Sequence, residues 1–365
     1  MVENTFMEIC KAYRLPGEYV GHFKLKRGHI NESFRVDLNE DGLEKSYLFQ
    51  RLNHFVFKNP ELIMKNLQDV TAHIRRKLAE SGETDIKRKV LKPYEHDGEY
   101  LYLTEDGQYW RVMSFIYDAA TYDDFDLKRL AAIGRGFGRF LALLSDFPCE
   151  SLHETIPNFH NTPVRFDTFF KAYRDDINGR AADMVEEAHF LESVRLYADR
   201  FEKLYRDGQI CQRVTHNDTK GNNIMIDLAT EEPLAVVDLD TVMPGYAMND
   251  FGDAVRYAAN SAAEDEPDIS KVSLDLERYE ALADGFLMPM RGKFTPKEME
   301  NMPWGVLLMT LEVAVRFLSD YLDGDRYFKT AYDRHNLVRG RSQLALAKDI
   351  LRKFEQMEKI TEKYL

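Results

Sequence analysis

The spacing of apolar and polar residues divides the chain into two parts that differ in periodicity. Up to about residue 116, short runs alternate between apolar and polar side chains, which is typical of strands with one buried face. Between two of these runs, residues 60–81 have apolar side chains at helical spacing, and Gly82 follows as a helix stop. The expected strands are residues 21–26, 33–38, 46–52, 100–103 and 110–116. This part predicts a five-stranded antiparallel sheet with one helix.

After Tyr117 the apolar residues recur at helical spacing almost throughout. The expected helices are residues 127–144, 165–173, 186–205, 250–260, 276–290, 303–322 and 341–364. The sequence contains neither an internal repeat nor a low-complexity linker. It predicts an α+β fold with two lobes, a small antiparallel sheet lobe at residues 1–115 and a larger, mostly helical lobe at residues 116–365, with a site between them.

Composition and charge narrow the classes of partner. Of the 365 residues, 44% are hydrophobic and 30% are charged, as in an ordinary globular protein, and the length is sufficient for two lobes with their own cores. The net charge of −13 argues against nucleic acid or an anionic membrane as the main partner. The oligomeric state is open between a monomer and a homodimer.

Compartment follows from the cysteines and the apolar stretches. Cys10, Cys149 and Cys211 are too few and too scattered for a disulfide framework or a zinc site. The first ten residues lack the pattern of a signal peptide, and the most apolar stretch, residues 306–318, is short for a membrane span and contains two charged residues. We therefore expect a reduced, cytoplasmic compartment.

The residues best suited to chemistry lie in two segments of the helical part. Asp218 lies five residues before Asn223, and Asp238 follows Asp218 by twenty residues, at the end of the apolar run 235–237. In protein kinases, one carboxylate orients the acceptor hydroxyl and accepts its proton, while an amide and a second carboxylate hold Mg²⁺ on the nucleotide phosphates. A carboxylate at the end of a buried strand also needs a partner or a metal. We interpret Asp218 as the base and Asn223 and Asp238 as metal ligands, with ATP and Mg²⁺ as cofactors.

A literal Asp-Phe-Gly also occurs, at Asp250, Phe251 and Gly252. It has the letters of the metal-binding motif of protein kinases, but it lies too far beyond Asp218 and opens a helical pattern. We expect Asp250 to be the N-cap of that helix.

A phosphate-binding turn is expected between the first two strands. Gly28, His29, Ile30 and Asn31 lie there, and backbone N–H groups of such a turn can bind phosphate. His29 has two interpretations, an exposed loop histidine or a side chain over the cleft near sugar or phosphate.

The third strand has no Lys where kinases place their phosphate-binding Lys. Gln50 or Arg51 could substitute, but the alternation of side chains lets only one of them face the cleft. Adenine is expected to bind after the fifth strand, in a segment that includes Met113 and Phe115. Lys220 could reach the transferred phosphoryl group or cap a neighbouring turn.

These motifs resemble those of the aminoglycoside phosphotransferase and choline kinase superfamily, which has a protein-kinase-like fold. Over nearly its whole length the chain is also similar to the N-acetylhexosamine 1-kinases. The resemblance is carried by residues 28–36, 214–220, 222–223, 238–245, 250–253, 316–328 and 335–339. It implies phosphorylation of the anomeric hydroxyl of GlcNAc and GalNAc, the roles given above for the base and the second carboxylate, and sugar contacts from Arg316 and Tyr327. Thr219 and Asp240 lie in the same strings and are further candidates for the substrate site.

Several alternatives remain. Arg316 lies four residues after Glu312, a spacing that favours an ordinary ion pair on a helix. Related kinases act on choline, homoserine or aminoglycosides. A site for a cationic acceptor is expected to contain carboxylates or an aromatic cage, and Arg316 on the expected acceptor side argues against such an acceptor. A nucleotide-binding scaffold without activity would not need all of Asp218, Asn223 and Asp238. A hydrolase using the two carboxylates would leave Asn223 unexplained.

Overall fold

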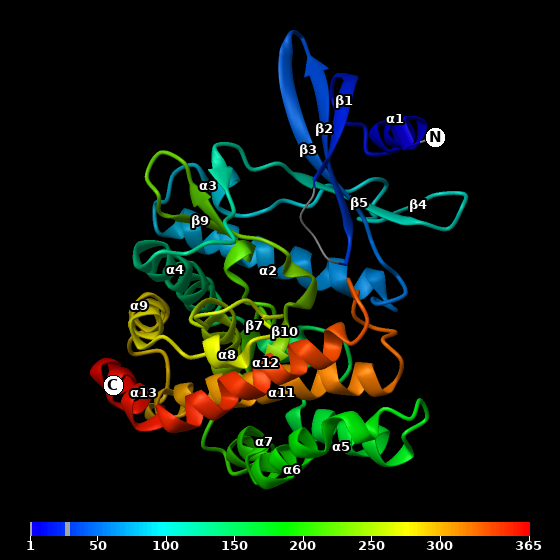
Figure 1. Cartoon of the computed structure of the whole chain (residues 1–365). Helices are drawn as coiled ribbons and strands as arrows, with labels where there is room; N and C mark the ends of the chain where they lie inside the picture. Colours follow the sequence, from blue (N-terminus) through cyan, green and yellow to red (C-terminus); the bar gives the residue numbers. More distant parts are fainter. Residues whose placement is uncertain (1, 26–29) are drawn as a thin grey trace.

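A five-stranded antiparallel sheet forms the upper part of the molecule in Figure 1, above a larger helical part. The computed structural model describes residues 2–25 and 30–365. The strands are β1 (Glu18–Leu25), β2 (Glu32–Glu40), β3 (Leu43–Arg51), β4 (Tyr102–Leu103) and β5 (Tyr109–Ser114), in the order β1-β2-β3-β5-β4. The sheet expected from the alternating pattern is confirmed.

One face of this sheet is covered by a helix that the sequence pattern did not lead us to expect, α1 (Val2–Ala12). Phe6 of α1 packs its ring edge-on against Phe34 and Trp110, at centroid distances of 5.1 and 5.5 Å. The side chains that alternate with these positions point to the opposite face. Ser33, Gln50 and Arg111 therefore face the helical part.

The long helix α2 (Pro60–Glu80) occupies the expected range. Its buried side, however, belongs to the core of the helical part and not to the core between α1 and the sheet. Asn66 fixes it there, because its side-chain amide donates to the carbonyls of Val242 and His153 at 3.0 and 2.8 Å. The division of the chain at residue 115 stays a prediction.

The helical part is built around α11 (Met302–Leu322), which is apolar on almost all sides. The other helices of the described chain are α3 (Ile86–Lys89), α4 (Leu127–Leu143), α5 (Thr162–Asp175), α6 (Val185–Val194), α7 (Arg200–Arg206), α8 (Ala247–Ala258), α9 (Leu276–Leu287), α10 (Pro296–Glu300), α12 (His335–Arg352) and α13 (Phe354–Thr361). By length and composition, α11 alone among the described helices could cross a membrane, and 89% of its most apolar window is buried in the protein. Its apolar surface is thus used for packing.

Two expected helices are each divided in the structure. The range 341–364 breaks at Lys353, between α12 and α13. The range 186–205 contains the 3₁₀ turn Arg195–Tyr197 between α6 and α7. From Ala188 to Phe201 a buried side chain recurs about every third residue. Because a 3₁₀ helix has three residues per turn, the 3₁₀ segment keeps these side chains on one face, whereas in a continuous α-helix they would rotate away from it.

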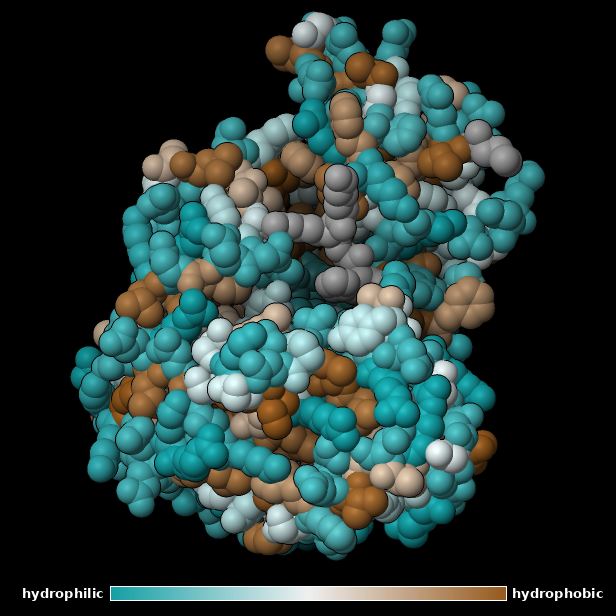
Figure 2. All heavy atoms as spheres, viewed as in Figure 1, coloured by the Kyte–Doolittle hydropathy of each residue, from teal (hydrophilic) through white to brown (hydrophobic). Residues whose placement is uncertain are grey.

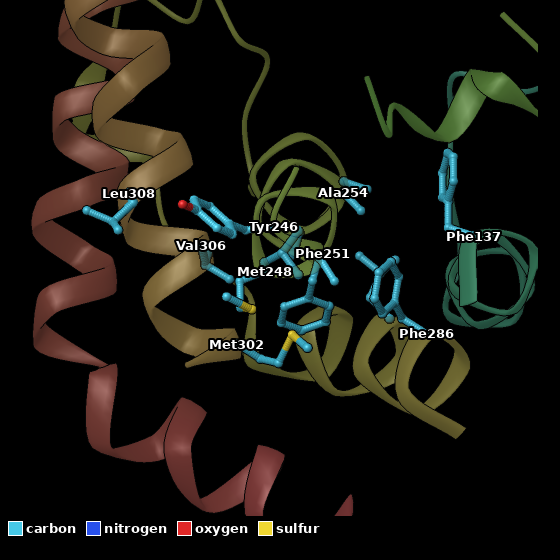
Figure 3. Close-up of a cluster of buried hydrophobic side chains, with 14 of the residues drawn as sticks. Phe137, Tyr246, Met248, Phe251, Ala254, Phe286, Met302, Val306 and Leu308 are labelled. Carbon is cyan, nitrogen blue, oxygen red and sulfur yellow. The ribbon is translucent and has the colours of Figure 1, made fainter. Parts of the chain in front are cut away.

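Helices α8 and α11 approach each other closely at two glycines. A Cβ atom on Gly305 would lie 1.9 Å from the carbonyl oxygen of Met248, and one on Gly252 would lie 2.2 Å from the carbonyl oxygen of Gly305. Figure 3 shows the buried side chains around this contact, with Phe251 near Phe286 of α9. This close packing fixes the position of α8 against α11.

Candidate active site

Two neighbouring strand ends bring the three predicted catalytic residues together. The strands β8 (Ile224–Asp227) and β9 (Pro233–Val236) pair antiparallel with Ile224 opposite Val236. The backbone N–H of Val237 continues this pairing and donates to the Asn223 carbonyl at 2.9 Å. Asn223 and Asp238 therefore lie at the same edge, and the Asn223 amide donates to the Asp218 carboxylate at 3.2 Å.

The charge of Asp218 is set by its neighbours. Lys220 Nζ lies 3.0 Å from Asp218 Oδ1. Desolvation opposes ionisation of Asp218, but attraction to Lys220 and His216 outweighs it and lowers the pKa of the carboxyl below its usual value. Attraction to Asp218 in turn raises the pKa of Lys220. Asp218 is thus held as a carboxylate, which is the form that can orient a hydroxyl and accept its proton.

Asp238 stands in the opposite electrostatic situation. It has a left-handed backbone conformation, with φ of 60°, and the residue is exposed to solvent. Desolvation by the surrounding protein, together with the negative charges of Asp240 and Asp218, raises the pKa of Asp238. A cation at this edge would relieve the excess negative charge.

The ligands present fit Mg²⁺ held jointly with a nucleotide. Within the described residues, no group of three or more His, Cys, Asp or Glu side chains is arranged to hold a metal. Mg²⁺ does not need such a group, because it is usually bound by one or two carboxylates together with substrate phosphates and water. Asn223 and Asp238 offer two oxygen ligands of this kind.

The sheet lobe is joined to this edge through Asp240, whose side chain is 2% exposed. Arg111 of β5 donates to Asp240 Oδ1 at 2.5 Å, and Asn31 donates to Oδ2 at 2.5 Å. Arg111 also donates twice to Gln50 Oε1, at 3.0 and 2.8 Å, and Gln50 donates to Ser33 at 2.8 Å. These residues form one polar row across the sheet, since Ser33 pairs with Gln50 and Gln50 with Arg111.

This row decides which of the two residues on β3 faces the cleft. Gln50 points to the face turned toward the helical part, whereas Arg51 lies on the other side of the strand and forms an ion pair with Glu32. The cation on the cleft face comes instead from β5, as Arg111. Of the expected phosphate turn, Gly28 and His29 lie outside the described residues, and Ile30 lines the cleft.

Between the sheet and the helices lies a cleft of about 1130 Å³, which has Asp218 and Lys220 in its wall. Figure 2 shows the surface hollowed where the two parts meet. Arg316 of α11 also lines the cleft, with its guanidinium 5.2 Å from the ring centre of Phe159 and 5.6 Å from that of Phe328. The cleft thus connects the predicted base with the predicted sugar-binding residues.

Tyr327 and Phe328 are placed in the cleft wall by a buried carboxylate. Asp320 accepts the backbone N–H groups of Tyr327 and Phe328 at 2.8 and 2.9 Å, and its side chain also accepts from Asn336 at 2.9 Å. The Tyr327 residue is 57% exposed, so its ring is available to an occupant of the cleft. Asp320 lies within the string 316–328, but the sequence did not reveal that it organises this loop.

A family model described as the phosphotransferase enzyme family matches residues 26–283, which is more than half of the chain. The chain belongs to this family. The matched range includes the polar row on the sheet and all three of Asp218, Asn223 and Asp238. The phosphotransferase therefore carries its predicted catalytic residues inside the region that defines the family.

Solved structures of low sequence identity have the same fold. Choline kinase from Cryptosporidium parvum Iowa II is 13% identical, with a TM-score of 0.57 and 99% of each chain covered. Ethanolamine kinase from Plasmodium vivax is 13% identical, with a TM-score of 0.53, covering 88% of this chain and 81% of its own. Spectinomycin phosphotransferase, solved with ADP and spectinomycin, is 14% identical, with a TM-score of 0.55, covering 97% and 98%. The expected protein-kinase-like two-lobe fold of this phosphotransferase is confirmed.

In the Asp-Phe-Gly at residue 250, the Asp supports the segment before Asp218, and the expectation that Asp250 is a helix N-cap is wrong. Helix α8 begins at Ala247, so Asp250 lies inside its first turn. The Asp250 carboxylate accepts the backbone N–H groups of His216 and Asn217 at 2.7 and 2.8 Å. It thereby holds the loop just before Asp218. The helix starts earlier than the apolar periodicity indicates, which moved Asp250 out of the capping position.

The remaining predicted residues are placed as follows. Thr219 is fully buried, and its hydroxyl donates to the Asp250 carbonyl at 2.6 Å, so the geometry favours support of the loop over a contact with substrate. Met113 is buried on the cleft face of β5, and Phe115 follows the strand with its ring beside Tyr117. Their contact with adenine stays a prediction.

The alternative interpretation of Arg316, an ion pair with Glu312, is wrong. Glu312 is fully buried and bonds instead to His160 Nδ1 at 2.7 Å and to the Thr162 hydroxyl at 2.8 Å. In the part of the chain that the structure describes, Arg316 forms no ion pair, and two aromatic rings flank it. The helical spacing of four residues allowed the pair, but His160, far away in sequence, takes the carboxylate.

Proposed function

We propose that this phosphotransferase transfers the γ-phosphate of ATP to the anomeric hydroxyl of an N-acetylhexosamine, such as GlcNAc or GalNAc. The observation that supports this most is Arg316, which contacts the rings of Phe159 and Phe328 and lines the same cleft as Asp218. A guanidinium held against aromatic rings offers several donors in one plane. Such donors suit the hydroxyl and acetamide oxygens of a neutral sugar, and they repel a cationic acceptor.

The roles proposed for the catalytic residues follow from their charges. Asp218, held ionised beside Lys220, orients the acceptor hydroxyl and accepts its proton as the bond to phosphorus forms. Asn223 and Asp238 would hold Mg²⁺, which neutralises charge on the nucleotide phosphates. Lys220, three ångströms from Asp218, is near enough to face the transferred phosphoryl group.

The nucleotide would lie against the cleft face of the sheet. Arg111 is a cation on this face, where the expected Lys of β3 is missing, and Gln50 holds it in place. Backbone groups of Ile30 and Asn31 would contact phosphate, and Met113 and Phe115 would contact adenine. A small-molecule acceptor, rather than nucleic acid or a membrane, and a cytoplasmic location remain part of the proposal.

One observation favours a second candidate, a cationic acceptor such as an amino alcohol or an aminoglycoside. Asp123 and Asp124 lie in the cleft wall together with the aromatic Phe125 and Tyr257, and carboxylates beside rings bind cations. Part of this charge is already engaged, since Asp123 accepts from the Asn222 amide at 3.1 Å and Asp124 lies 3.6 Å from Arg129. The sugar is therefore preferred.

A panel assay separates the two candidates. ATP consumption is measured with N-acetylhexosamines, other hexoses, choline, ethanolamine, homoserine and aminoglycosides, and the phosphorylated position is identified by phosphorus NMR. Asp218→Asn serves as the matched inactive control. Formation of a sugar 1-phosphate supports the proposal. Phosphorylation of a hydroxyl group on the cationic acceptors alone would establish the second candidate. If no acceptor is phosphorylated, both candidates are contradicted.

A further inference from the structure

A buried histidine links the helix of the proposed acceptor site to the catalytic loop. His160, whose side chain is 8% exposed, lies between Glu312 of α11 and the backbone carbonyl of Asn217. Its Nδ1 is 2.7 Å from Glu312 Oε1, and its Nε2 is 2.9 Å from the Asn217 oxygen. Asn217 directly precedes Asp218 in the chain.

The partners of His160 fix a proton on Nε2 and are compatible with a second proton on Nδ1. A backbone carbonyl only accepts hydrogen bonds, so Nε2 must donate to Asn217. The second Glu312 oxygen accepts from the Thr162 hydroxyl at 2.8 Å, which suits an ionised carboxylate. Desolvation opposes the charge on both groups, but their mutual attraction outweighs it, so the pKa of His160 is raised and that of Glu312 is lowered. These directions and the geometry favour an imidazolium paired with a carboxylate.

Other charges near His160 act against each other. Arg316, one turn along α11 from Glu312, lowers the pKa of His160, whereas Glu312 raises it more strongly. On the side of α8, His160 and the buried Asp250 attract each other. Asp250 also bonds to the N–H of Asn217. The two peptide groups on either side of Asn217 are thus held, one by a cation and the other by a carboxylate.

The conformation that this arrangement fixes is an uncommon one. Asn217 has φ of 62°, in the left-handed region that few residues other than glycine adopt and that Asn tolerates better than most. Its side chain is also bonded, since the Thr215 hydroxyl donates to Oδ1 at 3.0 Å and Nδ2 donates to the Thr241 carbonyl at 2.9 Å. A strained residue persists where its surroundings over-determine it, and such residues cluster at functional sites.

We propose that doubly protonated His160, anchored by Glu312, is a positioning residue that fixes the Asn217 carbonyl and thereby the direction of Asp218. Glu312 and Arg316 both lie on α11. The helix therefore positions the acceptor through Arg316 and the base through Glu312 and His160. This inference deepens the proposed function and rests on it only for the kinetic test. The hydrogen bonds of His160 go to Glu312 and to the Asn217 carbonyl, not to the Asp218 side chain.

The protonation state is tested without any acceptor. In ¹⁵N NMR of the full-length protein at pH 7.5, His160 is expected to show two protonated ring nitrogens, above the ordinary histidine pKa of about 6.5. Glu312→Gln, which keeps the shape and removes the charge, should let one nitrogen lose its proton. In hydrogen exchange, the segment 214–224 of His160→Gln should exchange about tenfold faster than in the wild type. A singly protonated ring in the wild type, or unchanged exchange in a folded His160→Gln, would overturn the proposal.

The kinetic test uses the acceptor found in the panel. The raised pKa of folded His160 means that its stabilising contribution is complete below the ordinary pKa and is lost as pH rises through the folded value. The alkaline fall of kcat should move to lower pH in Glu312→Gln, by roughly one unit or more. His160→Gln should lower kcat about tenfold while KM for ATP stays within about twofold. An unchanged alkaline limb in Glu312→Gln would assign the pair a merely structural role.

A matched control comes from another histidine with a carboxylate partner. His73 of α2 lies 3.1 Å from Asp146 and makes no contact with the catalytic loop. His73→Gln should leave kcat and its pH profile unchanged. If the wild type phosphorylates nothing in the panel, the proposed function fails, whereas the NMR and exchange results still decide the role of His160.

Discussion

The ion pair of Arg111 with Asp240 leads to a strong prediction about stability. Arg111 comes from the sheet and Asp240 from the helical part, and their side chains are 1% and 2% exposed. Changing Arg111→Met leaves a carboxylate without its cation in a dry environment, and Asp240→Asn leaves a buried guanidinium without its anion. Removing one partner of a buried pair costs about 3–5 kcal/mol. Because Gln50 and Asn31 remain as hydrogen-bond partners, we expect the lower end, about 3 kcal/mol for each single variant.

The double variant should be more stable than the sum of the two single changes implies. With both charges gone, no uncompensated charge remains, and replacing a whole buried pair is often close to neutral. The coupling energy of the cycle should therefore exceed about 2 kcal/mol. The exposed pair of Lys171 and Asp175, with side chains 73% and 41% exposed, provides the control. The same cycle there should give about 0.5 kcal/mol or less.

Urea unfolding measures these energies. The midpoint and slope are recorded by far-UV and near-UV circular dichroism, and coincident transitions establish that a single free energy describes the unfolding. Two outcomes would refute the reasoning: single-variant costs below about 1 kcal/mol, or costs that simply add in the double variant. Either would mean that water or other groups already neutralise the pair.

Four further predictions concern the cleft and the core. Asp218→Asn should keep the fold but lower kcat by about 10²–10⁴-fold; a variant with more than about a tenth of wild-type turnover would remove Asp218 from the role of base. Asp238→Ala should raise the Mg²⁺ concentration needed for half-maximal activity, so an unchanged titration would place the metal elsewhere. Arg316→Ala should lower kcat/KM for the sugar by roughly ten- to a hundredfold, as expected for a lost hydrogen bond to a charged donor, while KM for ATP stays constant; an effect on ATP alone would contradict the sugar role. Gly305→Ala should destabilise the protein by about 1–3 kcal/mol in urea unfolding, whereas Gly21→Ala, where a Cβ meets open space, should not.

The sequence predicted those features that depend on residues close together along the chain. Asn223 was singled out by its spacing from Asp218, and Asp238 by the apolar run before it; the register of β8 with β9 places the two at one edge. The sheet and α2 followed from periodicity in the same way. Local patterns of this kind are set by burial on one face of a strand or helix.

Contacts between distant segments could not be predicted. Arg111 looked like an ordinary strand residue, because nothing in its own neighbourhood reveals that Asp240 lies beside it. Glu312 and Arg316 have the spacing of an ion pair, yet the carboxylate is taken by His160, 152 positions away. Which charged side chains pair depends on their distance in the folded structure and on how far each is removed from water, and a single sequence shows neither.

The membership of α2 in the larger core has a consequence for dividing this protein into fragments. The helix lies between β3 and β5 in the chain, but its apolar side chains, among them Met64, Leu67 and Val70, pack in the cluster of the helical part. A fragment ending at residue 115 would contain the complete sheet and α1, together with a long helix whose partners are missing. Its exposed apolar stripe would favour self-association. A circular permutation or split version that keeps α2 with the helical part should therefore be far more soluble than a cut at the end of the sheet.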